Sequence, residues 1–135
     1  MPFWNALARV YGRLRSAEMM RDECNRQYPK YTEQNDVGYA YWRKKHAELI
    51  LEMDSIRGRQ LRKLAKTDKE YRQALIDYER QLDASAREVR AETLPAGSDK
   101  TAVACKVLAT YFATDEMDVK KKMAKDIELI RSFDR

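Results

Sequence analysis

The residues best equipped for chemistry are two cysteines, Cys24 and Cys105, and one histidine, His46. A pair of thiols with no third cysteine, placed on segments that we expect to be neighbours, favours a Cys24–Cys105 disulfide. Such a bond persists only in an oxidising compartment. The alternative is that each cysteine packs as a small buried thiol, as free cysteines usually do. A zinc site is not expected, because two thiols far apart in the sequence and one imidazole elsewhere do not provide four ligands.

The single imidazole offers little support for catalysis. His46 lies with Trp42 and Leu49 on one apolar helical stripe, where a lone histidine is more often a hydrogen-bonded core or rim residue than a catalyst. No serine lies in a G-x-S-x-G context, and the E-x-x-H pair of a di-metal bundle is absent, because position 43 is Arg43. We therefore expect a protein that is not an enzyme, with no cofactor and no metal. The same stretch holds a candidate ligand or contact cluster: Tyr39, Trp42 and His46.

Basic residues form the most visible charge pattern. The chain has 27 Lys and Arg against 22 Asp and Glu, a net charge of +5. A nucleic-acid-binding protein gathers such residues on one face and interleaves aromatic side chains for stacking, whereas Glu52, Asp54 and Asp77 interrupt the pattern here. We expect solvated helix faces, with nucleic acid or an anionic surface as a less favoured partner. The densest predicted basic surface patch consists of Arg57, Arg59, Arg62, Lys63 and Lys66.

Glycine and proline are too scarce for a β-rich fold. Four Gly and three Pro in 135 residues do not supply the turns that an all-β domain needs, and no apolar run approaches the about 20 residues of a membrane helix. Apolar residues instead recur at helical spacing, as at Phe3, Leu7, Val10 and Leu14. The sequence predicts one all-α domain, residues 1–135, folded as an up-and-down bundle of four to five amphipathic helices.

Caps and breaks predict where these helices begin and end. Pro2 suits a first helical position, and Pro29 forces the residue before it out of the helical region. The stretch from Thr67 to Glu70 has the T-x-x-E form of a capping box. Thr114 offers a further cap, which makes either a kink or a new helix. The predicted helices cover residues 2–26, about 32 to 66, 67–94, 98–112 and 119–133.

One short motif stands out near the first cysteine. The stretch Cys24-Asn25-Arg26-Gln27-Tyr28-Pro29 is followed by Tyr39 and Trp42-Arg43 in a long predicted helix, and by Cys105 near the start of a late one. This arrangement resembles small uncharacterised exported helical proteins of Gram-negative bacteria, in which a C-x-x-x-[FY]-P element precedes a helix with a tryptophan and the late cysteine pairs with the first. The resemblance implies an all-helical, disulfide-bonded periplasmic protein, and it implies no activity.

Three functions remain open. We expect first a non-enzymatic periplasmic or secreted bundle that acts through surface contacts, as an envelope-accessory or protein-interaction module with an unidentified partner. Residues 1–5 lack the basic region of a signal peptide and Arg9 interrupts the apolar stretch, so an exported chain would be a mature form with an added Met. The second function is that of a small basic cytosolic nucleic-acid-binding or regulatory protein, in which the disulfide is less expected. The third is a ligand-binding bundle that uses Tyr39, Tyr41, Trp42 and His46.

Overall fold

The computed structural model describes residues 2–135, and this part of the chain is helical with no strand. The predicted all-α class is therefore confirmed. Within the same residues, no helix combines the length and the apolar character needed to cross a bilayer. In chain order the elements are α1 (Pro2–Gln27), η1 (Pro29–Tyr31), α2 (Thr32–Lys45), α3 (Ala47–Leu64), α4 (Asp68–Thr93), α5 (Asp99–Tyr111), η2 (Asp115–Met117), α6 (Val119–Lys122) and α7 (Ala124–Asp134).

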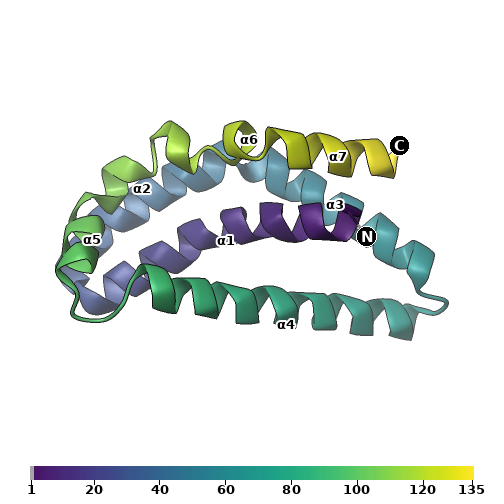
Figure 1. Cartoon of the computed structure of the whole chain (residues 1–135), viewed down its shortest axis with the longest axis horizontal. Coiled ribbons are helices and arrows are strands. Elements are labelled where there is room, and N and C mark those ends of the chain that lie inside the picture. The colour runs from purple at the N-terminus through teal and green to yellow at the C-terminus, as the bar shows by residue number, and fades with distance from the viewer. Residues whose placement is uncertain (1) are drawn as a thin grey trace.

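The long segments of the bundle alternate in direction (Figure 1). α1 starts at the end where both termini lie, α2 and α3 return to that end, α4 runs parallel to α1, and α5 to α7 return again. α1 lies between α4 and the α5–α7 segment and packs on all the other helices. At the end that holds the termini, the rings of Phe3 and Phe133 stack with their centroids 4.5 Å apart. α1 is thus the central element around which the other helices are arranged.

The apolar stripe of α1 forms the centre of the core, as its spacing predicts. An α-helix buries residues three and four positions apart on one face, and the buried residues of that stripe are Phe3, Leu7, Val10, Leu14, Ala17 and Cys24. Later helices add buried apolar side chains to the same core cluster, among them Trp42, Met53, Ile56, Leu108, Phe112 and Ile130.

The long helix expected from about residue 32 to 66 is bent at His46, where α2 ends and α3 begins. His46 has φ −101° and ψ 3°, outside the helical region, although its backbone N–H still donates to the carbonyl of Trp42 at 3.1 Å. The His46 Nδ1 atom lies 2.8 Å from the same carbonyl. A side chain that competes for a helical carbonyl is a known cause of a kink, and no glycine or proline marks this one in the sequence.

One predicted cap forms in part and another does not form, since the Thr114 hydroxyl donates to the carbonyl of Tyr111 and makes no cap bond. The Thr67 hydroxyl accepts a hydrogen bond from the backbone N–H of Glu70 at 3.1 Å, but the Glu70 carboxylate accepts from Lys66 rather than from Thr67. The last predicted helix is split at Met123, and Asp118 caps its first part, α6, by accepting from the backbone of Lys121. The capping box at Thr67 is therefore half formed, and residues 119–133 form two short helices rather than one.

A close approach between α2 and α5, and open space beside α1, predict opposite effects for two glycine substitutions. A Cβ atom on Gly38 in α2 would lie 2.8 Å from the Cα of Ala109 in α5, whereas one on Gly12 in α1 would meet nothing within 4 Å. We expect Gly38→Ala to lower the free energy of unfolding by about 1 to 3 kcal/mol, because the backbones must separate. Gly12→Ala should raise it by about 0.5 to 1 kcal/mol through helix propensity. Urea unfolding of both variants measures this, and shifts of the same sign would contradict it.

Candidate functional site

The two cysteines form the predicted disulfide between Cys24 in α1 and Cys105 in α5. Their Cα atoms lie 5.2 Å apart, and both residues are buried. The bond ties the C-terminal end of α1 to the middle of α5, and the two cysteines are separated by 81 positions in the sequence. Both thiols are consumed in this bond, so neither serves as a nucleophile or a metal ligand.

The predicted cluster of Tyr39, Trp42 and His46 comes together in the core. The rings of Trp42 and His46 stack with centroids 4.2 Å apart, and the ring of Tyr39 also stacks with that of Trp42. Trp42 is 1% exposed and His46 is 0% exposed, so neither presents a surface to a ligand in solvent. Tyr41 is 57% exposed and is not part of this stack. The Trp42–His46 pair is thus placed to hold α2 and α3 together and not to meet a ligand from solvent.

Hydrogen bonds of His46 identify its protonation state. Its Nε2 atom accepts from the backbone N–H of Val119 at 3.1 Å, so the ring proton lies on Nδ1, which donates to the Trp42 carbonyl. Asp118, which is buried and paired with Lys45, lies 4.0 Å from Nε2 and favours the charged ring. Burial outweighs this attraction and lowers the pKa of His46 below its usual value. The ring is a neutral connector between the kink and α6.

This buried imidazole predicts a loss of stability in mild acid. Because its pKa is lower in the folded chain than the unfolded value of 6.5, the unfolded chain takes up a proton first as the pH falls. We expect the free energy of unfolding to decrease below about pH 6.5, by at most about 1.4 kcal/mol per pH unit. Urea unfolding at several pH values between neutrality and about pH 5 measures the slope, in a range above the usual carboxylate pKa values.

The matched control is His46→Gln, whose amide can accept from Val119 and donate to Trp42 but does not titrate. Its unfolding free energy should not change with pH in this range. The same slope in this variant would assign the pH dependence to other groups and contradict the prediction.

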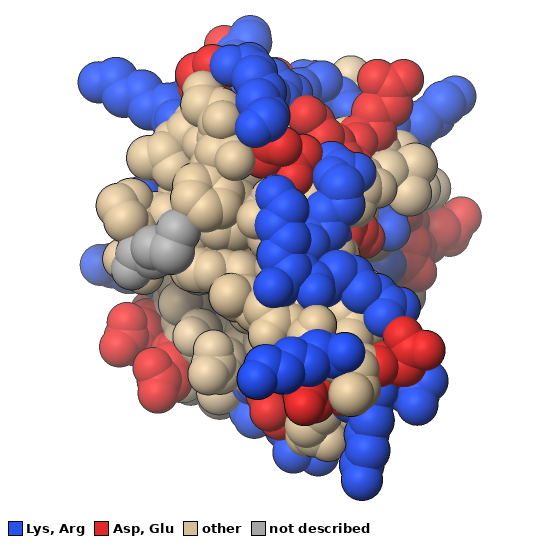
Figure 2. Space-filling model, turned by 90° about the vertical axis from the view of Figure 1, so that its right-hand side faces the viewer, with Lys and Arg blue, Asp and Glu red and all other residues tan. Residues whose placement is uncertain are grey.

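The five residues predicted as a basic patch are separated by their ion pairs. Arg57 has a side chain only 12% exposed, pairs with Glu79 of α4 and lies over the ring of Tyr11. Arg59 pairs with Asp134 at 2.7 Å, and Arg62 pairs with Asp68. The last two members of the set, Lys63 and Lys66, are exposed and form no ion pair within residues 2–135. Figure 2 shows the end of the bundle where α3 ends and α4 begins, and there Lys and Arg lie beside Asp and Glu. The five do not form one free cationic surface.

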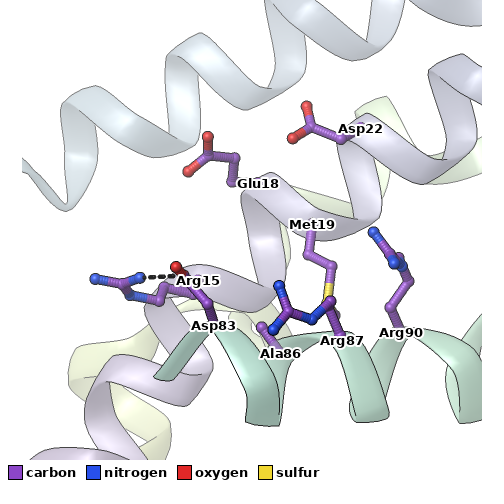
Figure 3. Close-up of a pocket in the computed structure, with 8 residues that line it drawn as sticks. All are labelled: Arg15, Glu18, Met19, Asp22, Asp83, Ala86, Arg87 and Arg90. Carbon is purple, nitrogen blue, oxygen red and sulfur yellow. Dashed lines mark hydrogen bonds and ion pairs between the residues drawn. The ribbon is translucent and has the colours of Figure 1, made fainter. Parts of the chain in front are cut away.

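A polar hollow of about 300 Å³ lies between α1 and α4 (Figure 3). Arg87 and Arg90 rise from α4 toward α1, while Glu18 and Asp22 on α1 point away from α4. Arg15 donates to Asp83 across the hollow at 2.9 Å. The lining has three arginines and three carboxylates, so the hollow has no net charge to select an anion or a cation.

The strongest candidate site is an apolar groove that the sequence analysis did not predict. Its main hollow, of about 520 Å³, lies between α1, the second half of α4 and the segment from α5 to α7, and its apolar lining includes four methionines: Met19, Met20, Met117 and Met123. A hollow of about 320 Å³ continues it toward the disulfide and shares Met20, Thr93 and Tyr111 with it. A third, of about 90 Å³, shares Gly12, Met19 and Val89 and extends it to Ala8.

The groove exists because two segments cover α1 from different sides. α4 packs on α1 and α3, whereas α5 to α7 pack on α1, α2 and α3, so a strip of α1 between them stays open. That strip starts with the small residues Ala8, Gly12 and Ser16, four positions apart. Val107 is 50% exposed and Val89 is 47% exposed at its walls. The four-residue spacing of small residues is the sequence signal that could have indicated this strip.

The chain was also compared with known proteins. No protein-family model, no curated protein and no solved structure matches it. The candidate function therefore rests on the geometry of the groove and on the disulfide.

Proposed function

We propose that this protein is an exported, non-enzymatic helical bundle that binds another protein through the apolar groove on α1. The observation that carries this proposal is the open, methionine-lined groove between α4 and the α5–α7 segment. Exposed apolar grooves on a water-facing surface are typical of interaction sites. Methionine side chains are flexible and polarisable, so they adapt to a partner's apolar residues.

Export is supported by the Cys24–Cys105 bond. Both cysteines of the chain are in one buried disulfide that joins two helices. Structural disulfides of this kind are typical of the periplasm and of secreted proteins and are rare in the cytosol. In such a compartment the covalent link would keep α1 and α5 together, and both of these helices line the groove.

A role in nucleic-acid binding is less well supported. Such a role needs cations that are free to replace the counterions of phosphate groups. Three of the five cations of the predicted patch, Arg57, Arg59 and Arg62, are already paired with carboxylates. Their charges are largely neutralised within the bundle, so the patch offers little to a phosphate backbone.

The test of the interaction is a photo-cross-linker placed in the groove of the protein in its native host. Benzoylphenylalanine at Ser16 lies on the floor of the groove, whereas the same group at Tyr41 lies on exposed α2. We expect a discrete adduct at position 16 that is absent at position 41. No adduct at position 16, or the same adducts at both positions, would overturn the proposed interaction.

The test of export is the redox state of the thiols in intact cells. Alkylation of acid-quenched, denatured cells before any reductant is added should leave Cys24 and Cys105 unmodified, and alkylation after reduction should label both. Two thiols that react before reduction would place the protein in a reducing compartment and overturn export, whatever the cross-linker shows.

A further inference from the structure

The two long sides of the groove differ in charge. Glu88 and Glu92 lie four residues apart on one edge of α4, three and seven positions after the groove residue Ser85. Both are exposed, and neither forms an ion pair within residues 2–135. On the side of the α5–α7 segment, Arg9 and Arg13 line the main hollow. By this spacing the groove has an acidic rim along α4, and we call the opposite side, where Arg13 is the arginine without an ion pair in the described residues, its basic rim.

The two arginines on the basic side of the groove differ in whether they form an ion pair. Arg9 donates two hydrogen bonds to Asp126 of α7, at 3.1 and 2.7 Å. Arg13 is exposed and forms no ion pair in the described part of the chain. Arg13 is the cation free to meet a carboxylate of a partner, while the charge of Arg9 is largely neutralised by Asp126.

The shape of the groove favours a helix over an extended segment. Its walls are side chains of helices whose backbone groups are already paired, so an extended peptide would leave its own N–H and C=O groups without partners. A helix satisfies these groups internally. The small residues Ala8, Gly12 and Ser16 let another backbone approach closely, and a Cβ on Gly12 would meet nothing within 4 Å.

The length of the groove sets the length of its occupant. The lining residues of α1 extend from Ala8 to Cys24, which is about 24 Å at 1.5 Å per residue. A helix of about four turns covers that distance. The hollows then hold side chains of its apolar stripe, while its two flanks face Glu88 and Glu92 on one side and Arg13 on the other.

We propose that the groove binds an amphipathic helix of another protein, about four turns long, with basic residues along one edge of its apolar stripe and acidic residues along the other. The inference rests on the proposed function, because it specifies the partner of the same groove. Opposite charges on the two rims also fix the direction of the helix, since turning it end for end brings like charges together.

The experiment uses three synthetic peptides of about 16 residues with one shared apolar stripe. The first carries Lys on one edge and Glu on the other, the second carries Lys on both edges, and the third carries Glu on both. Fluorescence anisotropy with the intact protein should give binding of the first peptide about 5- to 10-fold tighter than either other peptide. Circular dichroism should show that the bound peptide gains helix.

A charge reversal on the acidic rim provides the decisive variant. In Glu88→Lys with Glu92→Lys both rims are basic, so the peptide with Glu on both edges should become the tightest ligand, by about 5-fold or more. The matched control is Glu33→Lys with Glu48→Lys, two exposed carboxylates on α2 and α3, helices that contribute no residue to the three hollows. This control changes the net charge by the same amount as the double substitution on α4. It should still prefer the peptide with Lys on one edge and Glu on the other.

The outcomes separate the inference from the proposed function. Equal binding of all three peptides, abolished by Ser16→Arg, would keep the groove as an interaction site and overturn the charge-split helix. Binding without a gain of helix would overturn it as well, in favour of an extended segment. If the protein self-associates in sedimentation equilibrium and Ser16→Arg abolishes this association, the groove binds a second copy of the chain. That result would overturn the inference that it binds a helix of another protein. If no peptide binds but an adduct still forms at position 16 in cells, the charge-split helix is overturned and the proposed binding of another protein at the groove stands.

Discussion

Loss of the Cys24–Cys105 bond is expected to lower the free energy of unfolding by about 4 kcal/mol. In the chain-entropy description, a cross-link removes conformations from the unfolded chain, and the effect grows with the length of the closed loop. The bond spans 81 positions, a loop for which that description gives between about 4 and 5 kcal/mol. Because a typical domain is stabilised by only about 5 to 15 kcal/mol, this is a large share of the total.

The measurement is urea unfolding of Cys24→Ala with Cys105→Ala beside the oxidised and the reduced wild-type chain. The reduced wild type and the double variant should unfold at similar, lower urea concentrations than the oxidised protein. Reductant should not change the double variant, which controls for any effect of the reagent itself. A difference below about 1 kcal/mol between oxidised and reduced protein would contradict the prediction.

The disulfide also forms part of the candidate site. Cys24 lies in the wall of the hollow that continues the groove, beside Leu94 and Leu108. Without the bond, α5 is held on α1 by apolar contacts alone, and the groove loses the covalent restraint on one of its walls. We therefore expect reduction to weaken binding of a partner before it unfolds the bundle.

Helical periodicity predicts the fold well where burial is decided within one helix. The spacing of Phe3, Leu7, Val10 and Leu14 alone identifies the face of α1 that is buried. Periodicity does not predict the kink at His46, because the group that orients its imidazole ring lies far away in the sequence. The N–H that fixes the ring belongs to Val119, 73 positions later, and no pattern near His46 reports it.

The surface is harder to predict than the core, for a similar reason. Five basic residues near the end of α3 look like a patch when the helix is considered alone. Glu79, Asp68 and Asp134 neutralise three of them from α4 and α7, and these contacts depend on how the helices are arranged. Sequence spacing gives the face on which a residue lies, but it does not give the neighbours that this face meets.

The groove shows the same limit most clearly. Met20 lies at the edge of the apolar stripe of α1, next to Met19, and spacing alone cannot say whether a neighbouring helix covers them. They are only partly buried because α4 and the α5–α7 segment cover α1 from different sides. A candidate interaction site thus arises from the space between helices and not from any one sequence motif.

Trp42→Ala is expected to lower the free energy of unfolding by about 3 to 5 kcal/mol, the range for truncating a buried aromatic side chain. The indole is 1% exposed and stacks with both Tyr39 and His46. Its Nε1–H donates to the carbonyl of Met117 at 2.7 Å, and this bond is buried. The substitution therefore leaves a cavity, removes the stacking partner of His46 and deprives a buried carbonyl of its donor.

Two further variants divide this loss between packing and hydrogen bonding. Trp42→Phe keeps an aromatic ring but removes the donor to Met117, so it should cost about 1 to 3 kcal/mol, the penalty for an unpaired buried polar group. Tyr41→Ala, at the exposed neighbouring position, should stay within about 0.5 kcal/mol of the wild type. Urea unfolding of the three variants in one buffer gives the comparison. If Trp42→Ala costs less than about 1 kcal/mol, the side chain is not a core residue and a contact role at the surface becomes the better assignment.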